Sequence, residues 1–379
     1  MIINPIKVGV VGVGHLGQHH VKHYASIKEA DLIGLFDIDP SQAKKVAKQY
    51  NSCAFSSLAS LLKQVDAVSI VTPTVHHAFI AEKCINAGIH IFIEKPITKT
   101  LFEADKLLNF AQKMRTLIQV GHIVRLNPAL CALQAYQIQP KFVEIQRLAP
   151  YKTRGTDVPV VLDLMIHDID ILLSLIDSPV KTIRASGLSI LTDSVDIAHA
   201  RIRFDNGTVA SMVSSRVAKN KVRKLKLFQR ELYATIDLLL GLTEIYRIAD
   251  KLEDHPKALK TVPFEYNNRQ RHIIYDKPPI KDGDALKMEL INFTRSIQGE
   301  EIPKVVPEKV PESLPEVVPE EIPEPEPPVK EPEPEVMLTA INEKTVLEFV
   351  DESMPAKHYV KRYITETEYR EWFDVNYSE

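Results

Sequence analysis

The chain has 379 residues, 45% of them hydrophobic, a length that suits two to three domains of about 150 residues each. Its 47 Lys and Arg nearly balance 50 Asp and Glu, and the formal net charge of −3 argues against binding to nucleic acid through a basic surface. Three scattered cysteines exclude a disulfide framework, and with no leader-like start and no apolar run of about 18 residues we expect a soluble, cytoplasmic protein without a membrane segment.

The first third of the sequence predicts alternating strands and helices. Short apolar runs predict strands, and the amphipathic segments 40–50 and 100–114 predict helices between them. Continuous apolar strands joined by helices are typical of a parallel sheet covered on both faces. Residues 1–125 are therefore predicted to form a doubly wound domain, with strands at 6–11, 32–37, 67–71, 90–94 and 117–120.

The segment 126–300 is predicted to form a second, α+β domain. The strand-like runs 197–204 and 208–215 flank Asp205-Asn206-Gly207. Asn and Gly accept positive φ, so this tripeptide predicts a hairpin and an antiparallel sheet. Further strands are expected at 142–148 and 233–240, and helices at 161–176 and 284–298.

A proline-rich tract follows at 301–335. It holds eleven of the 25 prolines, and six of these recur every four residues from Pro303 to Pro323. We expect an extended Pro/Glu-rich linker that enters no sheet and no packed core. An acidic spacer is favoured over a docking tract for a partner. Residues 336–379 are predicted to be a C-terminal helix, near 342–351, and an aromatic tail.

A glycine motif, Gly12-Val13-Gly14-His15-Leu16-Gly17, follows the first predicted strand and opens a helix. The first glycine permits a tight turn, the second lets a pyrophosphate approach, and the third lets the helix pack closely. Asp37, at the end of the next strand, suits a ribose 2′-OH, and no Arg follows it, so NAD is preferred over NADP. The candidate cofactor ligands here are Gly12, Gly14, His15, Leu16, Gly17 and Asp37.

Two more motifs follow the strands 67–71 and 90–94. They are the run from Thr72 to His77 and the tripeptide Glu94-Lys95-Pro96. Ligands bind at the carboxyl ends of parallel strands, so these side chains are expected to face the nicotinamide half of the cofactor. The alternative is that the prolines merely end strands and that the lysine is solvated. The candidates are Thr72, Pro73, His77, Glu94 and Lys95.

Asp163 and His167 lie four residues apart in a predicted helix. This spacing places a carboxylate and an imidazole on one helix face, where the carboxylate can fix the tautomer and raise the basicity of the ring. The pair is a candidate for acid–base chemistry, although such pairs are often structural. Asp168 and Asp170 are close, but no Cys or His lies at a supporting spacing, so we predict no metal site.

These four motifs, in this order, resemble the Gfo/Idh/MocA oxidoreductases over about residues 5–300. The resemblance implies a Rossmann domain followed by an α+β domain with a large, mostly antiparallel sheet, which often serves oligomerisation, here a dimer or tetramer. It also implies that Lys95 and His167 serve the reacting hydroxyl of the substrate. His167, supported by Asp163, is then the favoured base and Lys95 the group that stabilises the alkoxide, although the two roles can be exchanged.

A narrower resemblance lies in the runs 121–129 and 154–158, which are similar to the bacterial UDP-N-acetylglucosamine 3-dehydrogenase branch of that family. It implies oxidation of the sugar-nucleotide 3-OH to a 3-keto sugar, with an aminotransferase as functional partner in 3-amino sugar (lipid A-type) biosynthesis. The chain departs from the branch at Leu126, where Phe is common, and in the proline tract. The substrate-binding candidates are Lys95, Arg125, Arg154, Asp163 and His167. The basic run Arg216, Lys219, Lys221, Arg223 and Lys224 either holds the diphosphate or is a solvated strand face.

Two alternatives stay open. The first is the same chemistry on another sugar, sugar nucleotide or cyclitol. The second, of another class, is a non-catalytic NAD-binding scaffold or sensor that recruits partners through the proline tract.

Overall fold

The computed structural model describes residues 4–151, 158–251, 259–266, 268–281, 283–307 and 316–319. These residues fall into two compact units. The first comprises Met1–Gln139, Ile169–Asp177 and Gln229–Leu314, and the second includes Pro140–Asp168 and Ser178–Phe228. Within the described ranges no helix is long and apolar enough to cross a membrane. The predicted helix near 342–351 and the aromatic tail lie outside the described residues.

A six-stranded parallel sheet forms the centre of the first unit, in the order β3-β2-β1-β4-β5-β6. The strand order reverses between β1 and β4, which is where ligands bind in doubly wound sheets. The predicted doubly wound fold is confirmed, with β1 and β5 at their predicted bounds. The strands are β1 Ile6–Val11, β2 Ala30–Phe36, β3 Cys53–Ala54, β4 Ala67–Ile70, β5 His90–Glu94 and β6 Ile118–Gly121.

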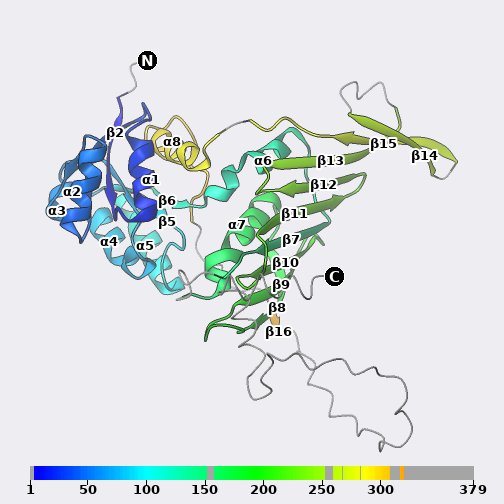
Figure 1. Ribbon diagram of the computed structural model, residues 1–379, viewed down its shortest axis with the longest axis horizontal. Helices are drawn as coiled ribbons and strands as arrows, with labels where there is room; N and C mark the ends of the chain where they lie inside the picture. Colours follow the sequence, from blue (N-terminus) through cyan, green and yellow to red (C-terminus); the bar gives the residue numbers. More distant parts are fainter. Residues whose placement is uncertain are drawn as a thin grey trace, which may run out of the picture. The chain divides into compact units, whose positions relative to one another are not determined.

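Helices cover both faces of this sheet (Figure 1). One face packs against α1 His15–Tyr24, α2 Pro40–Gln49 and α8 Ala285–Ile297, and the other against α3 Leu58–Leu62, α4 His77–Asn86 and α5 Leu101–Met114. The sequence places α8 with the segment 126–300, yet it lies beside α1, yellow against blue in Figure 1. Its side chains Leu286, Leu290 and Phe293 are buried in the same core as α1 and β1, so the chain returns to the first unit to finish it.

A ten-stranded sheet has the order β14-β15-β13-β12-β11-β7-β10-β9-β8-β16. β7 pairs with β10 and β8 with β16 in parallel, while the other described pairings are antiparallel. The expected large, mostly antiparallel sheet is confirmed, and Gly207 takes φ 84° in the predicted hairpin turn. The strands are β7 Phe142–Leu148, β8 Val180–Leu188, β9 Ile197–Phe204, β10 Val209–Ser215, β11 Val222–Gln229, β12 Leu232–Asp237, β13 Leu242–Ala249, β14 Lys260–Tyr266, β15 Arg269–Asp276 and β16 Glu316–Pro319.

The helix predicted at 161–176 has an irregular start. Val161–Met165 (η4) is one turn of π-helix, and Ile166–Leu175 (α7) continues as an α-helix. Single π turns are rare and often occur at functional sites. The remaining short helices are η1 Thr74–His76, η2 Ile123–Leu126, α6 Pro128–Cys131 and η3 Ala132–Ala135.

The prediction that the proline tract enters no sheet and no core is wrong where the tract is described. Val305 is buried in the core of the first unit, and its carbonyl accepts a hydrogen bond from the Val120 N–H at 3.1 Å. Further on, β16 pairs with β8 as the last strand of its sheet. Proline removes a donor but keeps its carbonyl, and an edge strand tolerates the missing donor.

A carboxyl group is buried inside the first unit. Glu289 of α8 is 0% exposed, and neither of its carboxyl oxygens has a hydrogen-bond partner among the described residues. Burial, with added repulsion from the carboxylates of Glu94 and Asp170, raises its pKa well above the usual value of 4.5. This shift favours the neutral, protonated form of the carboxyl group in the folded protein.

The variant Glu289→Gln tests this protonation. The unfolded chain releases the proton near pH 4.5 while the folded chain keeps it, so the wild type loses stability as the pH rises above that value. Relative to Glu289→Gln, its free energy of unfolding should fall by up to about 1.4 kcal/mol per pH unit until the folded-state pKa is reached. Denaturant unfolding from pH 5 to 8 measures this difference. The exposed Glu300→Gln is the matched control, and identical pH profiles for wild type and Glu289→Gln would contradict the prediction.

Candidate functional site

The glycine motif turns sharply out of β1 into α1. Gly12 has φ 87°, and a Cβ there would lie 2.6 Å from the Val71 carbonyl oxygen. A Cβ on Gly17 would lie 2.0 Å from the Gly12 carbonyl oxygen, so only glycine fits at either position. A Cβ on Gly14 would meet no atom within 4 Å. Gly12 and Gly17 thus shape the turn, while the space over Gly14 is open to a ligand at the N-terminus of α1.

Asp37 links this turn to the end of β2. Its carboxylate accepts the N–H of Val13 at 2.7 Å and the N–H of Asp39 at 3.0 Å. A carboxylate offers about four lone-pair sites, so two of them remain for a ligand hydroxyl. The carboxylate fixes the glycine turn and still has acceptor capacity for a ribose.

A cavity of about 1290 Å³ lies over the turn. It brings together five of the predicted cofactor ligands, Gly12, Gly14, Asp37, Thr72 and Pro73. The other predicted ligands, all of them described, are not among its lining residues: His15, Leu16, Gly17, His77, Glu94 and Lys95. The rest of the wall is mostly apolar, and the residues that sequence reasoning missed include Ile38, Leu62, His76, Phe79 and Ile80. The sequence offers one sign that these residues line the cavity: they come directly after a strand or lie on the helix that follows it.

His77 lies inside the protein, 1% exposed, between the two loops at the strand ends. Its ring nitrogens lie 2.8 Å from the Thr72 carbonyl oxygen and 2.9 Å from the Pro96 carbonyl oxygen. The preceding Lys95–Pro96 peptide bond is cis. His77 therefore ties the loop after β4 to the loop that carries Lys95, and its contact with the cofactor stays a prediction.

The side chain of Glu94 also points into the interior. Its carboxylate lies 3.1 Å from Nε2 of His20, a side chain that is 0% exposed. A Cβ on Gly121 would approach this carboxylate to 2.9 Å, so β6 needs glycine there. Glu94 thus anchors the end of β5 to α1, and Lys95, half-buried, comes directly after this anchor.

Arg125 makes a bidentate ion pair with Asp170, in which its Nε and Nη2 donate to the two carboxylate oxygens at 2.8 and 2.7 Å. Its Nη1 also donates to the Lys304 carbonyl oxygen at 3.2 Å. His122 lies 3.6 Å from the same carboxylate, and burial lowers its pKa although Asp170 opposes this shift. The guanidinium of Arg125 is thus engaged within the first unit, and its contact with substrate stays a prediction. Arg154 lies outside the described residues.

In the second unit, the π turn and the start of α7 carry Asp163 and His167, both half-buried. Both have polar interactions within the protein. The next residue, Asp168, is 1% exposed and pairs with Arg147 of β7 at 2.8 and 2.6 Å. Burial raises the pKa of Asp168 although Arg147 opposes this shift. This buried ion pair fixes the start of α7 on the sheet and so sets the position of His167.

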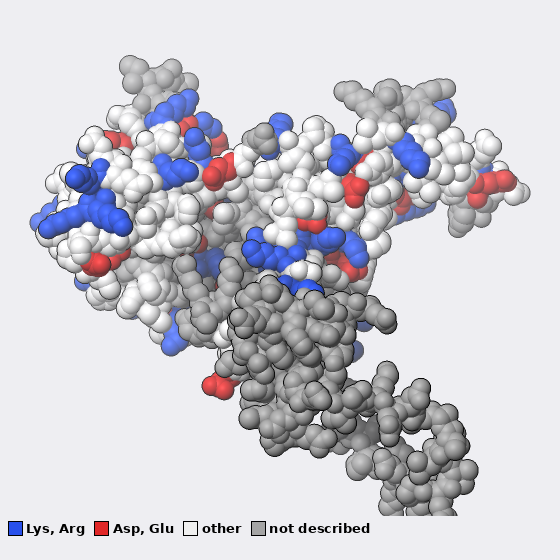
Figure 2. Space-filling view, viewed as in Figure 1, with Lys and Arg blue, Asp and Glu red and all other residues white. Residues whose placement is uncertain are grey.

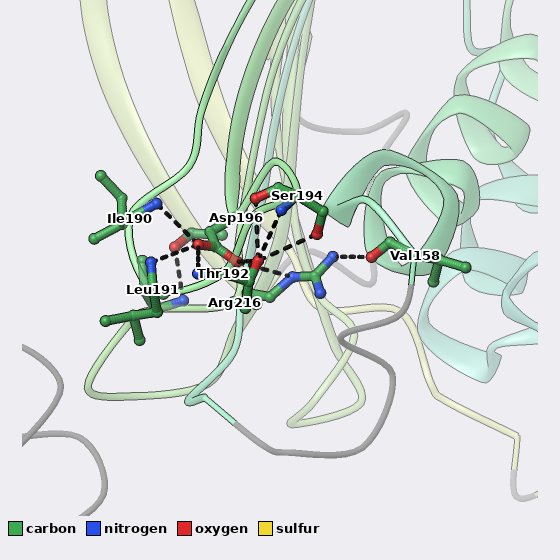
Figure 3. Close-up of polar contacts among 9 residues, drawn as sticks. Val158, Ile190, Leu191, Thr192, Ser194, Asp196 and Arg216 are labelled. Atoms are coloured by element: carbon green, nitrogen blue, oxygen red, sulfur yellow. Dashed lines mark hydrogen bonds and ion pairs between the residues drawn. The ribbon is translucent and has the colours of Figure 1, made fainter.

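The first member of the basic run is held inside the second unit (Figure 3). Arg216 is 5% exposed, donates to the Val158 carbonyl oxygen, and lies 3.7 Å from Asp196. Burial alone would raise the pKa of Asp196, but the N–H groups of the loop 190–192 and the Thr192 hydroxyl together lower it. Arg216 therefore stabilises a loop, whereas Lys219, Lys221, Arg223 and Lys224 are exposed.

The open space over Gly14 yields a direct test. Gly14→Ala should leave the melting temperature unchanged, because its Cβ meets no atom of the protein. The same methyl group should weaken dinucleotide binding at least about tenfold, since it occupies the approach to the pyrophosphate. Calorimetry with NAD and a thermal melt measure the two effects. Unchanged NAD affinity would contradict this use of the loop, and Gly17→Ala should lose both stability and affinity.

Two family models match the chain. Residues 6–122 match the oxidoreductase family with an NAD-binding Rossmann fold, and residues 111–231 match the GFO/IDH/MocA C-terminal domain. The UDP-N-acetylglucosamine 3-dehydrogenase of Acidithiobacillus ferrooxidans is 43% identical over 64% of this chain and 77% of its own length. A solved structure of that enzyme, 37% identical, matches with a TM-score of 0.72 over 80% of this chain and 92% of that chain.

Two other relatives are more distant. The scyllo-inositol 2-dehydrogenase (NAD(+)) of Bacillus subtilis is 28% identical over 56% of this chain and 68% of its own length. Levoglucosan dehydrogenase, solved with NADH and levoglucosan, shares the fold, with a TM-score of 0.65 at 18% identity over 80% of this chain and 92% of that chain. With the glycine turn, the acceptor at Asp37 and the two domain models in place, the chain belongs to the Gfo/Idh/MocA family of NAD-binding oxidoreductases.

Proposed function

We propose that this protein oxidises a secondary hydroxyl of a sugar nucleotide with NAD, namely the 3-OH of UDP-N-acetylglucosamine, to give the 3-keto sugar. The observation that carries the proposal is the 43% identity to a UDP-N-acetylglucosamine 3-dehydrogenase over 77% of that enzyme. The product would feed 3-amino sugar synthesis of the lipid A type, with an aminotransferase as functional partner. A homo-oligomer is proposed with it.

The described residues fit NAD. Gly14 leaves room for the pyrophosphate at the uncapped start of α1, and Asp37 offers acceptors to the ribose. A carboxylate there repels a 2′-phosphate, and the following residue, Ile38, is 90% exposed and carries no charge that would attract one. When bound, NAD accepts the hydride that leaves the carbinol carbon.

Lys95 is proposed to stabilise the developing alkoxide of the substrate. Its backbone is fixed on one side by the Glu94–His20 contact and on the other by the bond from His77 to Pro96. These two contacts fix the point at which the lysine side chain leaves the loop after β5. From there the ammonium group is proposed to reach the developing alkoxide.

His167 is proposed to take the hydroxyl proton, with Asp163 orienting its ring and raising its basicity. The Arg147–Asp168 pair holds the adjacent residue on the sheet and restrains the imidazole. The roles of His167 and Lys95 can be exchanged without changing the overall reaction, because both groups can bind a proton. The two assignments can be separated by measuring the pH profile of kcat in single variants of Lys95 and of His167.

The substrate is tested by mixing the purified protein with NAD and one of four compounds: UDP-N-acetylglucosamine, UDP-glucose, UDP-N-acetylgalactosamine or inositol. Absorbance of the reduced nicotinamide should rise with UDP-N-acetylglucosamine alone, after addition of glutamate and the aminotransferase if equilibrium hides turnover. Turnover of inositol instead would favour the chemistry of the Bacillus subtilis relative. NAD binding without turnover of any compound would favour a scaffold.

The variant Lys95→Met should lower kcat by about 10²–10⁴-fold, because the alkoxide loses its cation. NAD affinity should stay within about twofold of wild type, and the exposed Lys99→Met, four residues further on, is the matched control. His167→Gln should lower kcat over the same range. Near wild-type turnover by either variant, with NAD binding intact, would remove that residue from the mechanism.

A further inference from the structure

One face of the second unit's sheet changes from apolar to polar at its last row. On β10, β7 and β11 the paired side chains of that face form three successive rows: Ala210–Val143–Leu227, Met212–Ile145–Leu225 and Ser214–Arg147–Arg223. The first two rows are buried and entirely apolar. The third row lies at the strand ends and faces Asp168, the residue after His167. On this face of β10, β7 and β11, the described polar side chains therefore lie in the row beside the proposed base.

The charges in this row do not cancel. Arg147 and Arg223 stand directly opposite each other on neighbouring strands, an arrangement that is unfavourable for like charges. Asp168 uses both carboxylate oxygens on Arg147. Arg223 has no hydrogen bond or ion pair with any described residue. Partial burial together with the repulsion from Arg147 lowers its pKa, although the carboxylate of Asp168 opposes this shift. The three groups therefore carry one excess positive charge, exposed at Arg223.

Other cations nearby are already engaged or face the other side of the sheet. Arg216 is held by Val158 and Asp196 (Figure 3), and Lys226 pairs with Glu144 at 3.1 Å. Lys224 neighbours Arg223 in sequence, so its side chain leaves the opposite face of β11. Figure 2 shows Lys and Arg side chains gathered near the middle of the view. The strand pairing places Arg223 beside Arg147 on the face that meets Asp168, where it can bind an anion.

We propose that Arg223 binds the diphosphate of the substrate, an inference that rests on the proposed sugar-nucleotide function. Arginine presents a planar set of donors that matches two phosphate oxygens, and an anion there also relieves the repulsion between the two guanidinium groups. In a nucleotide sugar the diphosphate is attached at C1, two ring carbons from the 3-OH. Arg223 lies in the same row as Arg147, which pairs with Asp168, the residue after His167. A substrate whose 3-OH meets His167 can therefore place its diphosphate at Arg223. The anion site would select sugar nucleotides over neutral sugars and cyclitols.

Three variants test this site. Arg223→Gln removes the charge, Arg223→Lys keeps the charge without the paired donors, and Lys224→Gln removes one charge from the opposite face of the same strand. The probes are UDP and uridine, titrated calorimetrically into each protein with NAD present. Arg223→Gln should weaken UDP binding by about tenfold to hundredfold and raise KM for the sugar nucleotide similarly, with kcat nearly unchanged. Arg223→Lys should fall between, and Lys224→Gln should stay within about twofold.

Three readouts identify the bound group. Uridine affinity should not change in Arg223→Gln, since uridine carries no phosphate. NAD affinity should not change either, because the cofactor pyrophosphate lies at the glycine turn. The melting temperature should not fall, because Arg223 has no hydrogen bond or ion pair with a described residue and is repelled by Arg147.

Failure of the site and failure of the proposed function give different results. UDP affinity within about twofold of wild type in Arg223→Gln, equal losses for UDP and uridine, or no UDP binding by the wild type would each overturn the inference. Turnover of UDP-N-acetylglucosamine unaffected by Arg223→Gln would leave the function standing without this site. Arg223-dependent UDP binding with no oxidation of any UDP-sugar would leave the site standing without the function.

Discussion

The contact between Gly17 and the carbonyl of Gly12 is the constraint on which the first unit depends. It allows α1 to start directly over the end of β1, with no side chain between them. The same close approach leaves the space over Gly14 open and brings the Val13 N–H to Asp37. A methyl group on Gly17 would push α1 away from β1. It would also move the N-terminus of α1 away from the carboxylate of Asp37, the other group that we assign to cofactor binding. The shape of the cofactor site in this unit thus depends on the close contact between Gly17 and the Gly12 carbonyl oxygen.

The proposed catalytic groups of both units share a design in which a buried polar contact stands directly beside the residue that acts. Glu94, held by His20, precedes Lys95, and Asp168, held by Arg147, follows His167. Removing one partner of such a contact is costly, because the other polar group stays buried without a hydrogen bond. The neighbouring backbone is consequently stiff. We expect this arrangement to restrain the two proposed reacting groups, both half-buried, before substrate binds.

The sequence predicted much of the architecture because apolar periodicity and turn chemistry are local signals. The runs 6–11, 90–94, 142–148 and 197–204 are strands at the expected bounds, and the doubly wound sheet follows from them. The glycine motif and Asp37 were found because their spacing is dictated by a backbone turn. No local pattern reveals that His77 faces two carbonyl groups inside the protein, or that Asp168 rather than Asp163 meets Arg147. Those contacts depend on which strands become neighbours, which sequence spacing does not encode.

The proline tract and α8 also show that a local sequence pattern does not reveal which distant part of the chain a segment packs against. Composition predicts a tract outside the core, yet a single buried valine and one carbonyl suffice to join Val305 to β6. The amphipathic pattern of α8 gives an apolar face but not the sheet it covers. In both cases the segment is buried against residues that are far away in the sequence, and a local pattern does not identify them.

The return of α8 to the first unit has a consequence for synthesis on the ribosome. Domains generally fold as they emerge, N-terminal segments first. Here the apolar face of α1 receives Leu286, Leu290 and Phe293 from a segment almost 300 residues from the start of the chain. The core of this unit can therefore be completed only after the residues up to α8, including the strands from β7 to β15, have been translated. Chaperones that shield nascent apolar surface have a long interval in which to act on this protein.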